Sequence, residues 1–302
     1  MNYAIIQKKK IWLSFSVALF VVAVLALSFW GVKLGIDFTG GSLLEVNYSS
    51  DRPEVAKVEE KLKDLNLGSL AVQPLDTKGM VLRFQDSSKT KHDEALKRLG
   101  ELAKDKKVEE VRYDSVGPSI GVELKRKSLS AITWVLIAIV VYIGIAFQKV
   151  SKPISSWKYG ISALVAMAHD VVITVGVFAI LGHYLDMEIN TPFVAAVLTV
   201  LGYSVHDTIV VFDRIRENLP KVNDSFEGIV NTSLNQTLGR SLNTSLTVIL
   251  TLLAIIFFGG TAIRPFALAL TIGITIGTYS SIFVASPLLV IWEEYRLKKL
   301  AK

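Results

Sequence analysis

The chain alternates long apolar runs with short charged connectors, and one long polar insert interrupts this alternation. The first apolar run, residues 11–32, carries no charged side chain. About 20 apolar residues span a bilayer, so this run predicts a membrane-spanning helix. Five later runs approach or exceed that length, which predicts six spans in all. The later runs are residues 130–147, 159–181, 191–212, 242–258 and 266–292.

The polar insert follows the first apolar run, and its periodicity predicts a small α+β domain. Its apolar positions change between the spacing of strands and the spacing of helices. The order strand, helix, strand, strand, helix, strand is that of a ferredoxin-like unit. The expected elements are a strand around 43–46, a helix over 51–65, strands at 70–72 and 80–84, a helix over 91–102 and a strand at 108–113.

These patterns predict an α-helical polytopic membrane protein with an inserted ferredoxin-like β-α-β-β-α-β domain. Residues 1–34 would form the N-terminus and first span, residues 35–128 the inserted domain, and residues 129–302 the other five spans and the C-terminus. One long insert followed by closely spaced spans is half of the two-half plan of repeat-built transporters. The chain does not repeat at that scale, so the second half would be another polypeptide.

Composition supports a membrane protein and excludes several chemistries. Hydrophobic residues make up 51% of the 302 residues, which is high for a soluble domain. The net charge of +6 comes largely from short connectors, where it sets orientation rather than nucleic-acid binding. The absence of cysteine excludes disulfides and cysteine-based metal sites. No phosphate-binding Gly-x-x-x-x-Gly-Lys-Ser/Thr loop occurs, so we expect an energy source other than nucleotide. We expect the protein to be neither an enzyme nor dependent on a cofactor.

Basic residues predict the orientation in the membrane. Lys8, Lys9 and Lys10 precede the first span, and by the positive-inside rule the basic connectors share their side. Both termini would be cytoplasmic and residues 35–128 extracytoplasmic. The basic run Lys125-Arg126-Lys127, before the second span, would by itself place that end of the span on the cytoplasmic side. It has less weight because it follows a long translocated segment and the other connectors agree. The basic connector residues are Lys149, Lys152, Lys158, Arg214, Arg216, Lys221, Arg296, Lys298 and Lys299.

A cleaved signal peptide is the alternative for the first apolar run. Ala26-Leu27-Ser28 has the small-x-small form of a cleavage site. The run is long for the apolar core of a signal peptide, which favours a permanent span.

Two aspartates lie inside apolar runs, where an ionised carboxylate costs roughly 2.5–3.5 kcal/mol on insertion scales. Asp207 lies in the fourth run beside His206, and Asp170 lies in the third beside His169. The fifth run carries polar residues at helical spacing, and such a stripe must face protein or water. We therefore expect a polar seam between the third, fourth and fifth spans. The stripe consists of Gln236, Arg240, Asn243, Thr244, Thr247 and Thr251.

Arg240 is the expected counter-charge for Asp207, because arginine stays protonated and can hold a carboxylate ionised. Protonation of Asp207 would weaken that ion pair and free the helices to move. His206 could relay protons, and Asp170 could take part. The alternatives are a structural ion pair for Asp207 with Arg240 and packing hydrogen bonds for Asp170, His169 and His206. A metal site is disfavoured because adjacent helical residues point about 100° apart.

Two further groups of residues have structural interpretations. Asp213, Arg214, Arg216 and Glu217 end the fourth helix and could form ion pairs one turn apart on a solvated helix end. Gly273, Gly277, Ser281 and Ala285 recur every four residues in the last span, which is typical of close helix packing.

Several motifs along the chain resemble the SecF family, the membrane subunits that accompany SecD in Sec protein export. The most specific is the stretch through the fourth span that ends in Asp213-Arg214-Ile215-Arg216-Glu217-Asn218. The resemblance covers nearly the whole chain in the family's order. The other motifs are Gly35-Ile36-Asp37-Phe38-Thr39-Gly40-Gly41, Val116-Gly117-Pro118, Ala168-His169-Asp170-Val171 and Asn235-Gln236-Thr237-Leu238-Gly239-Arg240-Ser241.

The resemblance implies membership of the RND superfamily and a complex with SecD that uses the proton-motive force. It implies work in the cytoplasmic membrane with the SecYEG translocon, with SecA on the cytoplasmic side, on exported polypeptides. The family's membrane carboxylate falls on Asp207 and its basic partner on Arg240. The family usually has Asn before that Asp, where this chain has His206. Histidine is the residue type whose ordinary pKa lies near neutral pH, so the pH at which coupling occurs could differ from that of relatives.

Three other functions share parts of this pattern. Half of an RND-type exporter of lipids or small molecules has the same layout. A scaffold that stabilises partner subunits would need no titrating Asp207. An intramembrane aspartyl protease would use Asp170 and Asp207, but the Gly-x-Gly-Asp form of motif is missing around both.

Overall fold

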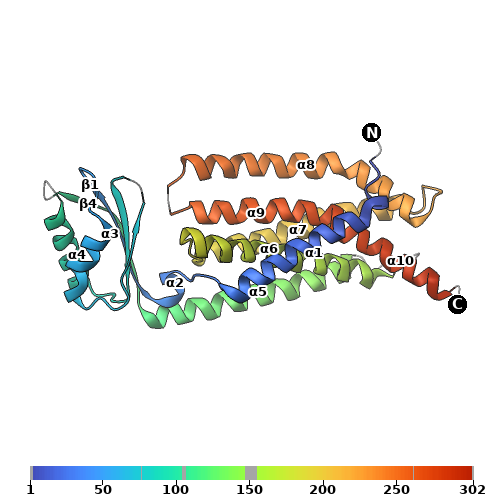
Figure 1. Cartoon of the computed structure of the whole chain (residues 1–302). Coiled ribbons are helices and arrows are strands. Elements are labelled where there is room, and N and C mark those ends of the chain that lie inside the picture. Colours follow the sequence, from blue (N-terminus) through green and yellow to red (C-terminus); the bar gives the residue numbers. More distant parts are fainter. Residues whose placement is uncertain (1–2, 76, 104–106, 147–154, 261, 301–302) are drawn as a thin grey trace. The chain divides into compact units, whose positions relative to one another are not determined.

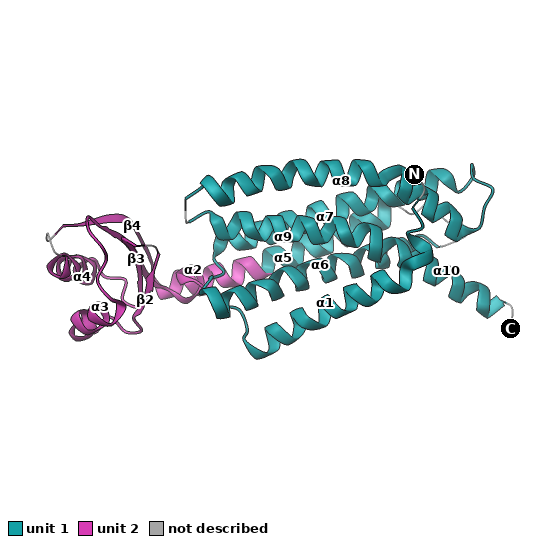
Figure 2. Ribbon diagram, turned by 45° about the horizontal axis from the view of Figure 1, so that its top comes forward, with its two compact units in different colours: residues 1–33, 130–302 teal, residues 34–129 magenta. Residues whose placement is uncertain are grey.

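The apolar runs and the polar insert fold as two units in the computed structural model. One unit comprises residues 1–33 and 130–302, and the other comprises residues 34–129 (Figure 2). The structure describes residues 3–75, 77–103, 107–146, 155–260 and 262–300. Lys149 and Lys152, used above to predict orientation, lie outside these described residues.

Within the described ranges, six helices are long and apolar enough to cross a membrane, as the runs predict. The helices extend past the apolar runs because charged residues can continue a helix into the interface. They are α1 (Lys9–Phe29, entered through the short turn η1, Ile6–Lys8), α5 (Pro118–Ala146), α6 (Ser156–Leu185), α7 (Thr191–Asn218), α8 (Phe226–Phe258) and the sixth, which runs from Arg264 to Leu300.

The sixth span is interrupted by one π-helical turn that the sequence did not indicate. α9 (Arg264–Ser280) leads into the turn η3 (Ser281–Ala285), and α10 (Ser286–Leu300) follows. Pro at the second position of α7 and of α9 fits the first helical turn, where its missing N–H is no loss.

The membrane-spanning unit is centred on α9, which packs against α6, α7 and α8. Figure 1 shows α8 and α9 side by side and α1 crossing the bundle beside α6. Small residues allow the closest approaches. A Cβ added at Gly176 of α6 would lie 2.5 Å from Cβ of Ala23 in α1, and one added at Gly277 of α9 would lie 3.2 Å from Cβ of Ser204 in α7. This small-residue packing brings polar side chains of different helices within hydrogen-bond reach.

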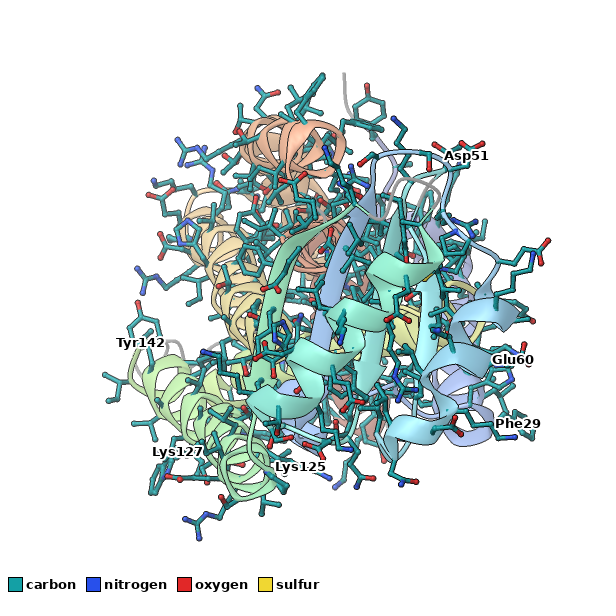
Figure 3. The ribbon with its side chains drawn as sticks, turned by 90° about the vertical axis from the view of Figure 1, so that its left-hand side faces the viewer. Phe29, Asp51, Glu60, Lys125, Lys127 and Tyr142 are labelled. Carbon is teal, nitrogen blue, oxygen red and sulfur yellow. The ribbon has the colours of Figure 1, made fainter. Side chains whose placement is uncertain are left out.

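The polar insert forms the expected ferredoxin-like fold, a four-stranded antiparallel sheet in the order β2-β3-β1-β4. Two helices, α3 and α4, cover one face of the sheet (Figure 3). The elements are α2 (Ile36–Thr39), β1 (Gly41–Tyr48), α3 (Val55–Leu62, continued by the turn η2, Lys63–Leu65), β2 (Ala71–Pro74), β3 (Gly79–Phe84), α4 (Lys89–Leu102) and β4 (Val108–Val116).

Helix α3 begins at Val55 rather than at the expected Asp51. The backbone N–H of Arg52 donates to the carbonyl of Thr77 at 3.1 Å, which keeps the chain before Pro53 out of the helix. The core contains Leu44 and Leu82 of the sheet and the aromatic ring of Tyr48. Burial raises the pKa of the Tyr48 phenol to about 12, and its hydroxyl has no hydrogen-bond partner among the described residues.

Candidate functional site

Asp207 lies in α7 with its carboxylate held by two serines from other parts of the bundle. The residue is 7% exposed. Ser241 Oγ of α8 donates to Oδ1 at 2.6 Å, and Ser281 Oγ of the η3 turn donates to Oδ2. Hydrogen bonds to a charged group contribute about 1.5–3 kcal/mol each. A single carboxylate therefore joins α7, α8 and the π-helical turn.

Asp170 of α6 makes a second, deeper junction and is fully buried. Its Oδ2 accepts hydrogen bonds from Ser204 Oγ of α7 at 2.5 Å and from Ser280 Oγ of α9 at 2.7 Å. His169 Nδ1 lies 3.0 Å from its Oδ1. The His169 ring stacks on Phe20 of α1, with centroids 6.3 Å apart.

Consecutive serines connect the two junctions, because Ser280 binds Asp170 and Ser281 binds Asp207. Neighbouring residues of a helix point about 100° apart, so one short segment can reach acids on two different helices. That segment is where α9 changes to the π-helical turn. Such turns are uncommon and frequently occur at functional sites. Each carboxylate is therefore hydrogen-bonded to one of the two residues at which α9 meets this turn.

A chain of hydroxyl groups extends the polar seam along α7, α8 and α9. Tyr203 OH lies 2.8 Å from Ser245 Oγ, which lies 2.5 Å from Thr278 Oγ1. The seam-facing residues of α8 recur every four positions and are buried. They are Ser233, Thr237, Ser241 and Ser245.

The expected ion pair between Arg240 and Asp207 does not occur among the residues that the structure describes, and Arg240 is exposed. The reason is helical geometry: Ser241 faces Asp207, so the residue before it points about 100° away. The predicted polar stripe of α8 is displaced for the same reason. Gln236, Arg240, Asn243, Thr244, Thr247 and Thr251 are exposed, and the serine-rich face beside them lines the seam.

Arg240 instead lines a polar cavity of about 390 Å³ between the ends of α7 and α8. Arg214 crosses between these helices, donating from Nη1 to Glu217 at 2.6 Å and from Nε to Gln236 Oε1 at 2.7 Å. Asp213 and Arg216 form the expected ion pair one turn apart, at 2.7 Å. His206, one residue before Asp207, is exposed. The cavity brings Asp213, Arg214 and Arg240 together but not His206 or Asp207.

The glycines after the first span serve a close backbone approach. Gly35 precedes α2, whose first turn contains Asp37. Gly40 and Gly41 have φ angles of +73° and +116°, which favour glycine. A Cβ at Gly40 would lie 2.8 Å from Cα of Pro118, and one at Gly41 would lie 2.6 Å from the carbonyl oxygen of Phe84. These residues form the turn into β1.

The serines that hold the carboxylates were not identified as ligands from the sequence, although their spacing was visible. Ser281 was recognised only as a small packing residue. Hydroxyl residues recur every four positions on α8, beside the polar stripe. This recurrence is the sequence signal that identifies the inward face of the helix. Among the described residues, no group of three or more His, Asp or Glu side chains could hold a metal ion.

Comparisons with known proteins find similarity along the whole chain. The family model described as "Protein export membrane protein SecD/SecF, C-terminal" matches residues 97–295, and the "SecD/SecF GG Motif" model matches residues 27–51. The protein translocase subunit SecF of Thermobaculum terrenum is 46% identical over 290 residues, covering 92% of this chain and 90% of the relative. That of Anaerolinea thermophila is 38% identical over 292 residues, covering 96% and 94%.

Two solved structures have similar folds. The crystal structure of SecDF, described as a translocon-associated membrane protein, from Thermus thermophilus has a TM-score of 0.84 and 33% identity. SecDF in its super-membrane-facing form has a TM-score of 0.71 and 32% identity. They cover 97% and 100% of this chain, whereas this chain covers only 39% and 40% of theirs.

Proposed function

The chain belongs to the SecD/SecF family of protein-export membrane proteins, and from this premise we propose that it couples the proton-motive force to protein translocation. Asp207 is the residue that binds and releases the proton. The observation that carries the proposal is the Asp207 junction, a buried carboxylate that holds α8 and a π-helical turn through one hydroxyl each. A group placed so that its charge state governs the contacts of three helical elements is suited to a proton-driven switch.

Protonation changes what the Asp207 carboxyl group can accept. The ionised form accepts from both serines, whereas the protonated form has one O–H that donates. One serine must then rotate to accept, or its bond is lost. The remaining bonds are also weaker, because neutral hydrogen bonds contribute about 0.5–1.5 kcal/mol instead of about 1.5–3. The proton therefore loosens α7 from α8 and from the η3 turn.

Arg240 acts in the other state of this cycle. Because it directly precedes Ser241, a rotation of α8 by about 100° would replace the Ser241 hydroxyl with the Arg240 guanidinium. That exchange favours the ionised carboxylate and expels the proton. Asp170 keeps α6, α7 and α9 together while the Asp207 junction opens, since its hydrogen bonds use Ser204 and Ser280 instead.

SecD is the proposed partner, and the exposed polar face of α7 and α8 is the proposed contact. His206, Arg240 and Asn243 are exposed on helices that span the membrane, and none has a hydrogen-bond or ion-pair partner within the described ranges. Exposing such groups to lipid is costly, so protein or water must cover them. In the two SecDF structures the part similar to this chain is joined to further sequence, since this chain covers 39% and 40% of them, and this supports SecD as the partner.

The proposed setting is the cytoplasmic membrane, beside the SecYEG translocon and SecA. Lys8, Lys10 and the basic ends of α7 and α10 favour cytoplasmic termini. The ferredoxin-like domain is then extracytoplasmic, where it can act on exported polypeptides when the helices move. The similar proteins described above are translocase subunits, which favours this function over export of lipids or small molecules.

The test is translocation of a secreted protein into inverted membrane vesicles that contain this chain and its partner. Asp207→Asn keeps the size and the hydrogen-bonding oxygen but cannot ionise. We expect export to lose its dependence on an imposed proton gradient. Asp186→Asn is the matched control, because Asp186 is a loop carboxylate paired with Lys33 at 2.5 Å. If Asp207→Asn leaves the gradient dependence unchanged while the complex remains assembled, the coupling role is wrong and the scaffold function is favoured.

A further inference from the structure

A groove of about 640 Å³ opens on the surface of the membrane-spanning unit, between α1, α8 and the junction of α9 with the η3 turn. None of the residues that form the two carboxylate junctions lines it, although Ser245 and Thr278 of the hydroxyl chain do. Its volume lies within the range of about 300–1,000 Å³ that is typical of sites for small molecules. The central lining is apolar and includes Trp12, Leu242, Leu246, Ile249 and Phe283.

One end of the groove is built by the N-terminal segment, which is fastened to α8. Asn231 Oδ1 accepts hydrogen bonds from the backbone N–H groups of Ile5 and Ile6, at 3.0 and 3.2 Å. Asn235 binds Tyr3 twice, with Oδ1 accepting from its N–H at 2.7 Å and Nδ2 donating to its carbonyl at 2.9 Å. Figure 1 shows this end of the chain beside α8. These bonds fix the mouth of the groove.

The mouth carries a positive charge that no acidic side chain neutralises. Lys8 lines the groove, is exposed, and has no ion-pair partner in the part of the chain that the structure describes. Its neighbour Lys9 differs, since its ammonium lies 2.6 Å from Glu294 and 3.4 Å from Glu227. The two adjacent lysines thus have distinct roles, and only Lys8 is available to an anion.

Trp12 contributes an aromatic ring to the groove lining. The indole N–H of Trp12 is buried and has no hydrogen-bond acceptor among the described residues. The ring lies against Phe283, with centroids 4.5 Å apart. Because this nitrogen is buried, Trp12 offers an occupant of the groove its ring and not its N–H donor.

We propose that this groove binds one acyl chain of an anionic phospholipid, with the headgroup at Lys8 and the chain against the Trp12 ring. The apolar lining suits a hydrocarbon chain, the groove lies on helices that cross the membrane, and the unpaired lysine supplies the charge complement. The groove is too small for a partner helix, whose diameter with side chains is about 10–12 Å. The binding does not depend on the function proposed above. The occupant would contact Ile282 and Phe283, which belong to the same turn as Ser281.

The test uses Trp12 as the reporter in the full chain with its partner in lipid vesicles. Trp30, Trp134, Trp157 and Trp292 are replaced by Phe. Fluorescence is quenched by phosphatidylglycerol with brominated acyl chains in a phosphatidylcholine background, and then with the bromine label on the phosphatidylcholine. One lysine near a membrane surface contributes about 1 kcal/mol to anionic lipid binding. That energy converts to an expected preference for phosphatidylglycerol of about fivefold.

Lys8→Gln should abolish this preference and Lys8→Arg should keep it. Lys10→Gln is the matched control, because Lys10 is exposed two residues further along the chain, in α1, but does not line the groove. Equal quenching by the two lipids in the unmodified groove overturns the proposal. Absence of quenching by either lipid also overturns it, since a protein segment then covers Trp12. If Lys8→Gln and Lys10→Gln reduce the preference for phosphatidylglycerol equally, general surface charge causes that preference and the proposed site is wrong.

Discussion

Replacing Gly273 by Ala tests how closely α9 must approach α7 for the carboxylate junctions to form. The added methyl group would lie 2.8 Å from Cγ1 and 3.0 Å from Cβ of Val200, and would overlap its Cγ2. Non-bonded carbon atoms prefer about 3.5–4.0 Å, so the helices must separate or Val200 must move. Overpacking of this kind costs about 1–3 kcal/mol. We expect a loss of this size in the free energy of unfolding.

The assay is thermal unfolding of the full chain in detergent, with gradient-driven export as a second readout. Gly202→Ala is the control, because a Cβ at Gly202 of α7 would meet no atom within 4 Å. Removing the Val200 methyl groups should relieve the overlap. The double variant Gly273→Ala, Val200→Ala should therefore lose less free energy of unfolding than the sum of the losses in the two single variants. A coupling energy of about 0.5–3 kcal/mol is typical of residues in contact. If Gly273→Ala is as mild as Gly202→Ala, or if Val200→Ala gives no relief, the close approach of α7 and α9 is wrong.

Three further predictions concern the soluble domain and the residue beside Asp207. Burial raises the pKa of Tyr48 from 10.0 to about 12, so the unfolded chain loses its phenol proton first as pH rises. The contribution of Tyr48 to the free energy of unfolding should be constant below pH 10 and should fall by about 3 kcal/mol towards pH 12. Urea unfolding should show this fall in the native chain and not in Tyr48→Phe. Gly40→Ala places a Cβ 2.8 Å from Pro118 Cα at a φ of +73° and should destabilise the domain by about 2 kcal/mol or more. Gly117→Ala is the control, because a Cβ there has no neighbour within 4 Å, and it should leave the free energy of urea unfolding unchanged. His206→Asn removes the imidazole beside Asp207 and keeps an uncharged side chain. Gradient-driven export should persist with a changed pH profile, and identical profiles would exclude a role for His206 in setting it.

The ferredoxin-like domain was predictable because its core positions repeat with the periods of strands and helices. Leu44 and Val46 alternate along β1, and Val58 and Leu62 are four apart on α3; all four are buried. The spans were predictable for a simpler reason, since the length of an apolar run is sufficient to predict a helix that crosses a bilayer.

The ligands of Asp207 were not predictable, because charge complementarity alone does not determine which face of a helix points inward. It favoured Arg240 over the adjacent Ser241, yet the two side chains diverge by about 100°. The rotation of α8 about its own axis decides between them, and the charges in the sequence do not determine that rotation. The π-helical turn at Ser281 has no sequence pattern of its own, since it arises from tertiary packing.

The most direct test of the central claim is to observe the proton on Asp207. Infrared difference spectra of the assembled complex in lipid, recorded between high and low pH, report the carbonyl stretch of a protonated carboxyl group. We predict that one such band appears on acidification, disappears in Asp207→Asn, and persists in Asp186→Asn. The same band should change position in Ser281→Ala, because Ser281 donates to this carboxylate. Identical spectra for the unmodified complex and Asp207→Asn would contradict the account, because the carboxylate that joins α7, α8 and the η3 turn would then not titrate.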